Sequence, residues 1–233
     1  MEGGEIRRLV ALEDHHWWYR ERRALLGRLS RRVPVVTGLA LDIGAAGGGN
    51  TRVLRDRGWR AVAVEYGGEG AVLARERGLT VLRADARALP LPSASADLVV
   101  SFDVLEHIVE DDQAAAEMRR VLHPGGTALI AVPCDMRLWS EHDVALSHVR
   151  RYTRESLREV IEKAGLRVQR LSSWNVLLRP VAAWRRRSSA GCDLGNLHPV
   201  VNAALTGIVT IERYLPVSSL PGISLVMVAQ RPL

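Results

Sequence analysis

The sequence predicts an α/β fold built on a doubly wound, mostly parallel sheet. Short apolar runs alternate with longer amphipathic stretches, which is the pattern of strands joined by crossover helices. A glycine-rich loop follows the first apolar run directly, and acidic residues stand at the ends of neighbouring runs. A chain of 233 residues suits one domain, so we expect residues 1–233 to fold together.

The core of this sheet is expected within residues 34–172. Strands are expected at residues 39–43, 59–66, 79–85, 96–104, 125–133 and 166–173. The helices that alternate with them are expected at residues 50–58, 71–78, 111–122 and 153–165. Gly58 and Gly78 would end the first two of these helices, and Thr153 would cap the start of the last.

The two ends of the chain depart from this alternation. Residues from about 5 to 30 have helical periodicity, which predicts an N-terminal helical cap over 1–33. Residues 173–216 contain two apolar stretches that we expect to form inserted helices, a lid before the last strand. That strand is expected within residues 217–233.

The charge of the chain does not favour a nucleic-acid partner. The net charge is +6, yet Lys163 is the only lysine among the basic residues. The longest basic run is Arg185–Arg187, and no nucleic-acid-binding motif is recognisable. We therefore expect a small-molecule partner rather than RNA or DNA.

The apolar residues and cysteines indicate the compartment. No run of about 18 apolar residues occurs, so no transmembrane helix is expected. The N-terminal stretch MEGGEIRRL lacks an apolar signal segment, which favours a cytoplasmic protein. Cys134 and Cys192 are too few for a disulfide scaffold or a zinc cage.

The glycine-rich loop LDIGAAGGGN spans residues 41–50. At the carboxyl end of a strand, such a loop brings backbone N–H groups close to a ligand, because glycine has no Cβ. Asp42, Glu65 and Asp85 stand at comparable strand ends. Glu65 follows Gly44 by 21 residues, the spacing at which an acid binds ribose hydroxyls. The glycines do not fit G-x-G-x-x-G, and the acids favour a ligand with cationic character over a pyrophosphate.

Further motifs follow the loop in a fixed order within residues 39–133: VEY, LRAD, FDVLEH and HPGG. Together with the loop they resemble the class I S-adenosylmethionine-dependent methyltransferases of the broad type-11 group. The stretches HHWWYRERR and SHVRRYTRESLREVIEKAGL extend this resemblance. It implies a Rossmann-like, seven-stranded sheet, mostly parallel with an antiparallel last strand. It also implies S-adenosyl-L-methionine as cofactor and S-adenosyl-L-homocysteine as product.

The resemblance assigns cofactor-binding roles along these motifs. Asp42, Gly44, Ala46 and Gly48 would hold the methionine end, Glu65 with Tyr66 the ribose, and Asp85 with Ala86 the adenine. Phe102 and Asp103 would line the floor near the sulfonium. Ala46 stands where the family has its second glycine, and we expect Gly47 to take the strained backbone conformation in its place.

The motif HHWWYRERR is expected to carry the N-terminal part of the site. Neighbouring residues of a helix lie about 100° apart, so Trp17 and Trp18 cannot both face the core. Trp18 is our candidate to cover the cofactor. Arg23, or else Tyr19 or Arg20, would reach the cofactor's carboxylate. The alternative is a helix that only packs against the sheet.

Methyl transfer to a hydroxyl gains from a general base, whereas an ionised carboxylate acceptor needs none. His107 in DVLEHI is the first candidate, because it follows a strand end that is expected to face the cofactor. His142 and His148 in SEHDVALSHVRRY are the next candidates. The alternative for Glu106 and His107 is a structural role in the turn into the next helix.

One candidate metal-ligand set lies after the fifth expected strand: Glu141, His142, Asp143 and His148. Its spacing matches no recognised template, so no metal is expected. Arg150, Arg151 and Tyr152 are expected to bind an acidic or polyhydroxyl acceptor, or else to cap the next helix.

The apolar stretch at residues 174–187 suits a hydrophobic lid or a homodimer contact. Because three arginines end it, peripheral contact with a membrane surface is the alternative.

We expect a methyltransferase acting on a small molecule, at oxygen, such as a sugar or a natural-product intermediate. Two alternatives stay open: an RNA methyltransferase, and a module that binds the cofactor without catalysis.

Overall fold

The computed structural model describes residues 3–34, 38–188 and 197–233, and its centre is one mixed sheet. The strands are β1 (Leu39–Ile43), β2 (Arg60–Glu65), β3 (Thr80–Arg83), β4 (Ala96–Phe102), β5 (Leu122–Pro133), β6 (Arg167–Trp174) and β7 (Ser224–Gln230). Their order across the sheet is β3-β2-β1-β4-β5-β7-β6, and β7 runs antiparallel to both of its neighbours. The predicted seven-stranded sheet, mostly parallel with an antiparallel last strand, is therefore confirmed.

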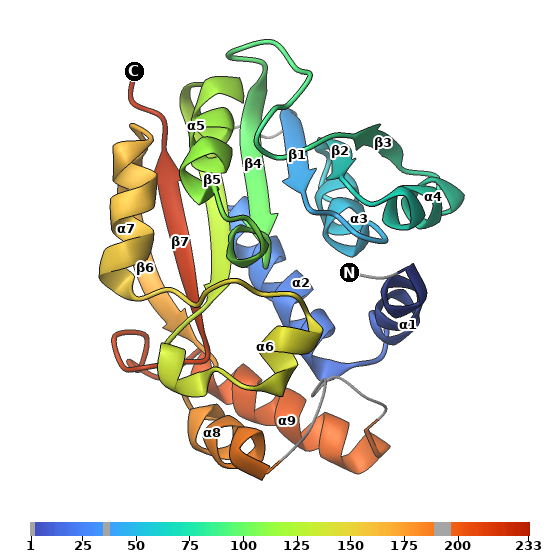
Figure 1. Ribbon diagram of the computed structural model, residues 1–233, viewed down its shortest axis with the longest axis vertical. Helices are drawn as coiled ribbons and strands as arrows, with labels where there is room; N and C mark the ends of the chain where they lie inside the picture. Colours follow the sequence, from blue (N-terminus) through green and yellow to red (C-terminus); the bar gives the residue numbers. More distant parts are fainter. Residues whose placement is uncertain (1–2, 35–37, 189–196) are drawn as a thin grey trace.

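Helices cover the sheet and gather beyond the carboxyl ends of its strands. They are α1 (Gly3–Leu12), α2 (Trp17–Ser30), α3 (Gly49–Arg55), α4 (Gly68–Glu76), α5 (Asp111–Val121), α6 (Glu141–Ala145), α7 (Arg154–Lys163), α8 (Arg179–Ser188) and α9 (Pro199–Glu212). In Figure 1 the parallel strands point toward α1, α6, α8 and α9. The end of the sheet where ligands bind in α/β proteins is thus the end that these helices cover.

The sheet is buried on both faces, and successive side chains of a strand point to opposite faces. Val99 of β4 lies in one apolar cluster with Met118 of α5. Leu98 and Val100, its neighbours on the strand, lie in a second cluster with Leu26 of α2. The strands therefore read as continuous apolar runs, which is why they could be recognised in the sequence.

The N-terminal segment is two helices, so the expectation of one helix from about 5 to 30 is wrong. A turn separates α1 from α2, and the His16 side chain accepts a hydrogen bond from the Trp18 N–H at 3.3 Å. This contact caps α2, because the first N–H groups of a helix have no partner within it. Glu13 and Asp14, in the same turn, reach side chains from other elements instead of continuing a helix.

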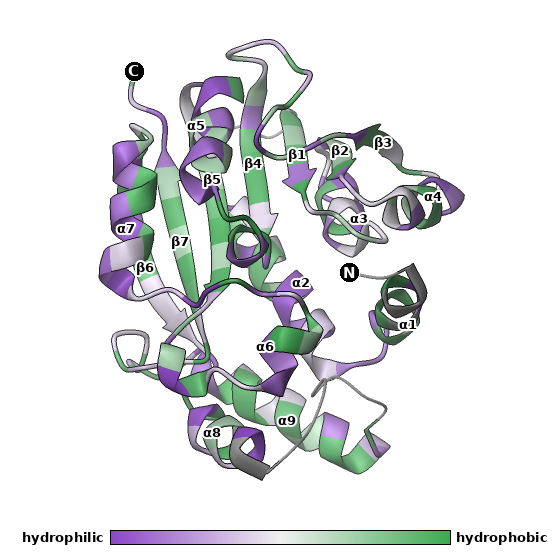
Figure 2. Cartoon of the chain, viewed as in Figure 1, coloured by the Kyte–Doolittle hydropathy of each residue, from purple (hydrophilic) through white to green (hydrophobic). Residues whose placement is uncertain are grey.

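The C-terminal half contains both expected helices of the insertion, α8 and α9. Thr153 caps α7 as expected, because its Oγ1 accepts a hydrogen bond from the Ser156 N–H at 3.1 Å. Figure 2 shows α9 as largely apolar, whereas polar and apolar residues alternate along α7. Across the described ranges, no helix combines the length and apolar character needed to span a membrane.

Candidate functional site

A cavity of about 310 Å³ lies at the carboxyl end of the sheet. Its walls come from the loop after β1, the end of β4, the start of α2, the segment around α6, and helices α8 and α9. Ten of the residues singled out from the sequence line it: Gly44, Ala46, Trp18, Arg23, Phe102, Asp103, His107, His142, His148 and Arg151. The fold therefore brings one end of the expected cofactor site and all three histidines to a single space.

Two glycines of the loop occupy positions that no other residue fits. Gly44 and Gly48 have φ values of +69° and +80°, in the left-handed region. A Cβ on Gly44 would lie 2.4 Å from Val104 Cγ2, and one on Gly48 would lie 2.1 Å from Leu79 Cδ1. The loop is therefore shaped by its own backbone and packs tightly against its neighbours.

Ala46 also has a positive φ, of +46°, and Gly47 does not, so the expectation about these two residues is wrong. The Ala46 N–H donates a hydrogen bond to Glu65 Oε2 at 2.7 Å, and the Gly67 N–H donates one to Glu65 Oε1 at 2.7 Å. A charge-assisted bond of this kind offsets the cost of an alanine in the left-handed region, about 1–2 kcal/mol. Glu65 thus holds the loop in this conformation.

The loop is surrounded by carboxylates. Asp42 is 1 % exposed and accepts a hydrogen bond from Thr51 Oγ1 at 2.6 Å. Burial, with smaller contributions from the charges of Glu13 and Glu65, raises the pKa of Asp42 to about 7. A ligand with a positive charge, such as a sulfonium or an α-ammonium group, would favour the ionised form of these acids. The residues present therefore fit S-adenosylmethionine.

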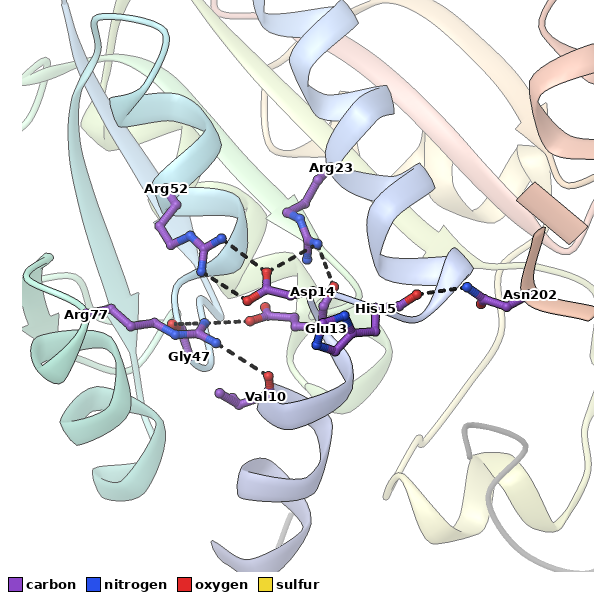
Figure 3. Close-up of polar contacts among 9 residues, drawn as sticks. All are labelled: Val10, Glu13, Asp14, His15, Arg23, Gly47, Arg52, Arg77 and Asn202. Carbon is purple, nitrogen blue, oxygen red and sulfur yellow. Dashed lines mark hydrogen bonds and ion pairs between the residues drawn. The ribbon is translucent and has the colours of Figure 1, made fainter. Parts of the chain in front are cut away.

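The turn between α1 and α2 is linked to the glycine-rich loop through Arg77 and is bonded directly to Arg52 of α3, as Figure 3 shows. Arg77 Nη1 lies 2.6 Å from Glu13 Oε2 and donates a hydrogen bond to the Gly47 carbonyl at 2.7 Å. Arg52 Nη2 lies 3.1 Å from Asp14 Oδ1. This set of contacts fixes α1 beside the loop.

Arg23 lines the cavity but is engaged by the same turn. Its Nη2 donates a hydrogen bond to the Glu13 carbonyl at 2.5 Å and lies 3.6 Å from Asp14 Oδ1. Figure 3 shows the guanidinium of Arg23 directed toward this turn. The side chain of Asn202, on α9, also donates a hydrogen bond to this turn, to the His15 carbonyl at 2.9 Å.

Arg22 is a residue of this site that the sequence analysis did not single out. Its guanidinium lies over the rings of Trp18, Phe102 and Trp174, at 5.6, 5.0 and 5.4 Å from their centroids. It also forms an ion pair with Asp103. Its Nη1 is buried at the cavity with no hydrogen-bond partner in the described chain. One feature of the sequence could have indicated its position. Arg22 precedes the buried Leu26 by four residues, and residues four apart lie on the same face of a helix.

Four residues expected at the ribose and adenine lie outside the cavity lining: Glu65, Tyr66, Asp85 and Ala86. Tyr66 is 71 % exposed. Asp85 pairs with Arg87 at 2.7 Å, and this hydrogen bond lowers the pKa of Asp85. These four residues lie at the carboxyl ends of β2 and β3, whereas the cavity extends from the loop after β1 toward β4 and the histidines.

The three candidate histidines form one cluster. The rings of His107 and His148 are 4.7 Å apart between centroids, and those of His142 and His148 are 6.4 Å apart. His148 Nδ1 lies 2.8 Å from Asp143 Oδ1, and His148 Nε2 lies 3.9 Å from Glu106 Oε1. His148 is therefore held by one carboxylate while its other nitrogen faces a second.

Burial sets the protonation of this cluster. Burial, with a smaller contribution from the neighbouring His148, lowers the pKa of His107 to about 4, so His107 is neutral at pH 7. Burial and the charge of Asp103 raise the pKa of Glu106 well above its usual value. For Asp143, burial is outweighed by hydrogen bonds from His148 and Arg151, which hold its pKa well below the usual range.

The segment SHVRRY places His148 and Arg151 at the cavity, with Arg150 and Tyr152 behind them. Arg151 lines the cavity, and its Nε lies 2.8 Å from Asp143 Oδ1. Arg150 Nη1 lies 2.6 Å from Asp111 Oδ2, and the Tyr152 hydroxyl donates a hydrogen bond to the same oxygen at 2.6 Å. Neither Arg150 nor Tyr152 is part of the cavity lining. Their observed contacts join the segment to the start of α5.

Comparison with known proteins agrees with this geometry. Residues 41–130 match the family model described as a methyltransferase domain. The chain is 29 % identical over 169 residues to a protein of Mycolicibacterium smegmatis named as a probable S-adenosylmethionine-dependent methyltransferase. That match covers 70 % of this chain and 64 % of the relative, so the chain spans less than two thirds of the relative's length.

Solved structures share the fold. The methyltransferase in a complex with the Haloferax volcanii Trm112 methyltransferase activator matches with a TM-score of 0.66 and 24 % identity, over 97 % of this chain and 94 % of that one. Phosphoethanolamine N-methyltransferase 2 of Haemonchus contortus, solved with S-adenosyl-L-methionine, matches with a TM-score of 0.62 and 20 % identity, over 91 % and 53 %. Residues 41–130 thus match a methyltransferase domain, and the fold of the chain is the one that these solved methyltransferase structures share.

Proposed function

We propose that the protein transfers the methyl group of S-adenosylmethionine to an oxygen atom of a small-molecule acceptor, such as a sugar or a natural-product intermediate. The observation that carries this proposal is the single cavity lined by both the glycine-rich loop and the histidine cluster. When bound, S-adenosylmethionine supplies a methyl group on a positively charged sulfur that an oxygen nucleophile can displace. A donor loop and polar groups in one enclosed space support transfer between two bound partners.

The residues of the loop would bind and orient the cofactor. Glu65 uses only part of its acceptor capacity on Ala46 and Gly67, because an ionised carboxylate offers about four lone-pair sites. It can therefore also accept from ribose hydroxyls. The aromatic side chains of Trp18 and Phe102 beside the cavity would exclude water from the reacting centre.

His148 is the proposed proton acceptor for the acceptor hydroxyl. Asp143 holds its Nδ1 at 2.8 Å, which orients the ring and leaves Nε2 for the substrate. A base in this position contributes about 10²- to 10⁴-fold to the rate. His107 and His142 stand beside it in the same cavity wall. The lowered pKa of His107 makes it a weak base, and this supports His148 over His107.

Helices α8 and α9 would close the acceptor end of the cavity. Leu178, Val181 and Leu205 line it, which supports the lid expected for residues 173–216. Trp184 and Ile211 are 72 % and 59 % exposed on these helices. Their exposure supports a further contact of this surface, with a second copy or with a membrane. Sedimentation of the protein alone and with lipid vesicles would separate these two partners.

Binding and turnover together test this function. Calorimetry should detect S-adenosylmethionine and S-adenosylhomocysteine, and Glu65→Gln should weaken both by about 10- to 100-fold, because a charged hydrogen-bond acceptor is lost. A panel of hydroxyl-bearing acceptors should then yield methylated product, and His148→Gln should slow its formation without changing cofactor affinity. His15→Ala, which changes an exposed histidine, is the control.

Three results would contradict the proposal. Cofactor binding without transfer to any acceptor would favour the binding module. Transfer to RNA with steep salt dependence would favour the RNA methyltransferase. Absence of cofactor binding would exclude both the small-molecule methyltransferase and the RNA methyltransferase.

A further inference from the structure

The carboxyl group of Glu106 is the least satisfied group in the cavity wall. The residue is 0 % exposed, and neither Oε1 nor Oε2 has a hydrogen-bond partner within the described residues. A buried carboxylate is ordinarily paired with a cation or bound to a metal, because its desolvation is costly. Glu106 therefore needs a partner that the described chain does not supply.

The nearest arginines are already committed to other carboxylates. Arg22 pairs with Asp103, and Arg151 pairs with Asp143 at 2.8 Å. These two pairs balance their charges locally. Over the described ranges, Glu106 is thus the carboxylate of this wall without a cation of its own.

Two histidines complete a set of metal-ligand atoms around Glu106. One ligand atom from each of Glu106, His107 and His148 lies within 4.8 Å of the others. Two imidazoles and one carboxylate are donors that divalent transition metals accept, with further positions left open for substrate. All three residues line the cavity, so open positions would face the acceptor.

The surroundings of His148 match those of a metal ligand. Asp143 holds its Nδ1 at 2.8 Å, leaving Nε2 to face Glu106 Oε1 at 3.9 Å. A carboxylate on the outer nitrogen is the usual partner of a metal-bound histidine. Ligand atoms on one Zn²⁺ lie about 3.3 Å apart, so only a small approach of these side chains is needed.

We propose that Glu106, His107 and His148 bind a divalent transition-metal ion such as Zn²⁺ at the acceptor end of the cavity. This site differs from the set dismissed on spacing, because Glu106 and His107 precede α5 and only the fold brings them to His148. The inference rests on the proposed function and deepens it. The metal would recognise an acceptor that offers two adjacent oxygen donors, and its charge would lower the pKa of the bound hydroxyl. His148 would then hold the metal, and the hydroxyl proton would pass to His142, the remaining candidate base in the same wall.

Metal binding can be measured without turnover. The full chain, without a histidine tag and stripped with a chelator, is titrated with Co²⁺ while its visible absorption is recorded. One equivalent should bind and give the bands of a nitrogen- and oxygen-ligated ion, and Zn²⁺ should displace it. Glu106→Gln and His148→Ala should each weaken Co²⁺ binding at least about tenfold. His15→Ala should bind as the unchanged protein does.

Cofactor affinity separates failure of this site from failure of the proposed function. Retained S-adenosylmethionine binding by each variant shows that the cofactor site is folded. Co²⁺ binding that is absent, or equal in the unchanged protein and both variants, overturns the metal site. If Co²⁺ binds as expected and S-adenosylmethionine does not, the metal site stands and the proposed function fails.

Discussion

At the scale of single residues, three neighbouring positions of the glycine-rich loop have a positive φ: Gly44, Ala46 and Gly48. The motif indicated a close-approach loop, and Gly44 and Gly48 have the positive φ values that require glycine. It did not indicate that Ala46 would share this conformation. The reason is a contact outside the motif, the hydrogen bond from Ala46 to Glu65 at 2.7 Å. A side chain 19 residues away along the chain thus decides the local backbone.

Asp42 gives a prediction on pH and stability. Its pKa is raised from 3.8 to about 7, mainly by burial, so the folded state binds its proton more tightly than the unfolded state. Its contribution to stability is therefore fully present below pH 3.8 and is lost as the pH rises to about 7. Asp42→Asn keeps an acceptor for Thr51 and cannot ionise. We expect the free energy of unfolding of this variant at pH 8 to exceed that of the unchanged protein by about 2–4 kcal/mol.

Urea unfolding at pH 4 and pH 8 measures this difference. The two proteins should differ much less at pH 4, where Asp42 is protonated in the folded state. Asp56→Asn is the control, because Asp56 is exposed and its substitution should change neither value. Parallel pH dependence of the Asp42→Asn variant and the unchanged protein would contradict the prediction.

At the scale of elements, the strands and most helices followed from periodicity, because both faces of the sheet are buried and each crossover helix has one apolar face. The turn between α1 and α2 did not. Its polar residues look like part of a charged helix in the sequence, but Glu13 and Asp14 bond to Arg77 and Arg52. Short α6 was also missed, although Ser140 and Asp143 form a capping box at its start.

The contact between this turn and the loop predicts a coupling between α1 and cofactor binding. Arg77→Gln removes the bonds to Glu13 and to the Gly47 carbonyl. Because α1 then lies less firmly over the methionine end, S-adenosylmethionine affinity should fall about 3- to 30-fold. Hydrogen exchange of α1 should become faster in the absence of ligand. Arg75→Gln, an exposed change in the last turn of α4 two residues before Arg77, should affect neither quantity.

At the scale of the whole molecule, the cavity is built from segments far apart in the chain. Asn202 of α9 contacts the start of α2 twice, at the Trp17 N–H and at the His15 carbonyl. This joins the C-terminal insertion to the N-terminal helices on opposite sides of one space. The insertion and the loop after β1 therefore both line the cavity, and under the proposed function they would form its acceptor and donor ends.

We therefore predict that changes in the insertion alter acceptor preference but leave the affinity for S-adenosylmethionine unchanged. Leu205→Ala enlarges the acceptor end, so KM for the best acceptor of the panel should change several-fold. The dissociation constant for S-adenosylmethionine should stay within about twofold, since Leu205 lies on α9 and the donor loop is elsewhere. Val201→Ala on the exposed side of α9 is the control. If Leu205→Ala changed KM for the acceptor and the dissociation constant for S-adenosylmethionine equally, the prediction would be contradicted.

The sequence by itself determined the part of this protein that is expected to bind the donor. The positions of the strands, the loop, Glu65 and the motifs behind it are local patterns, and the buried parallel sheet requires those patterns to appear in order. Only the tertiary structure decided the part that is expected to bind the acceptor. Arg22 among three aromatic rings, and Glu106 beside His107 and His148, depend on side chains brought together from distant segments. Such approaches are set by how the elements pack, and no periodicity along the chain encodes them.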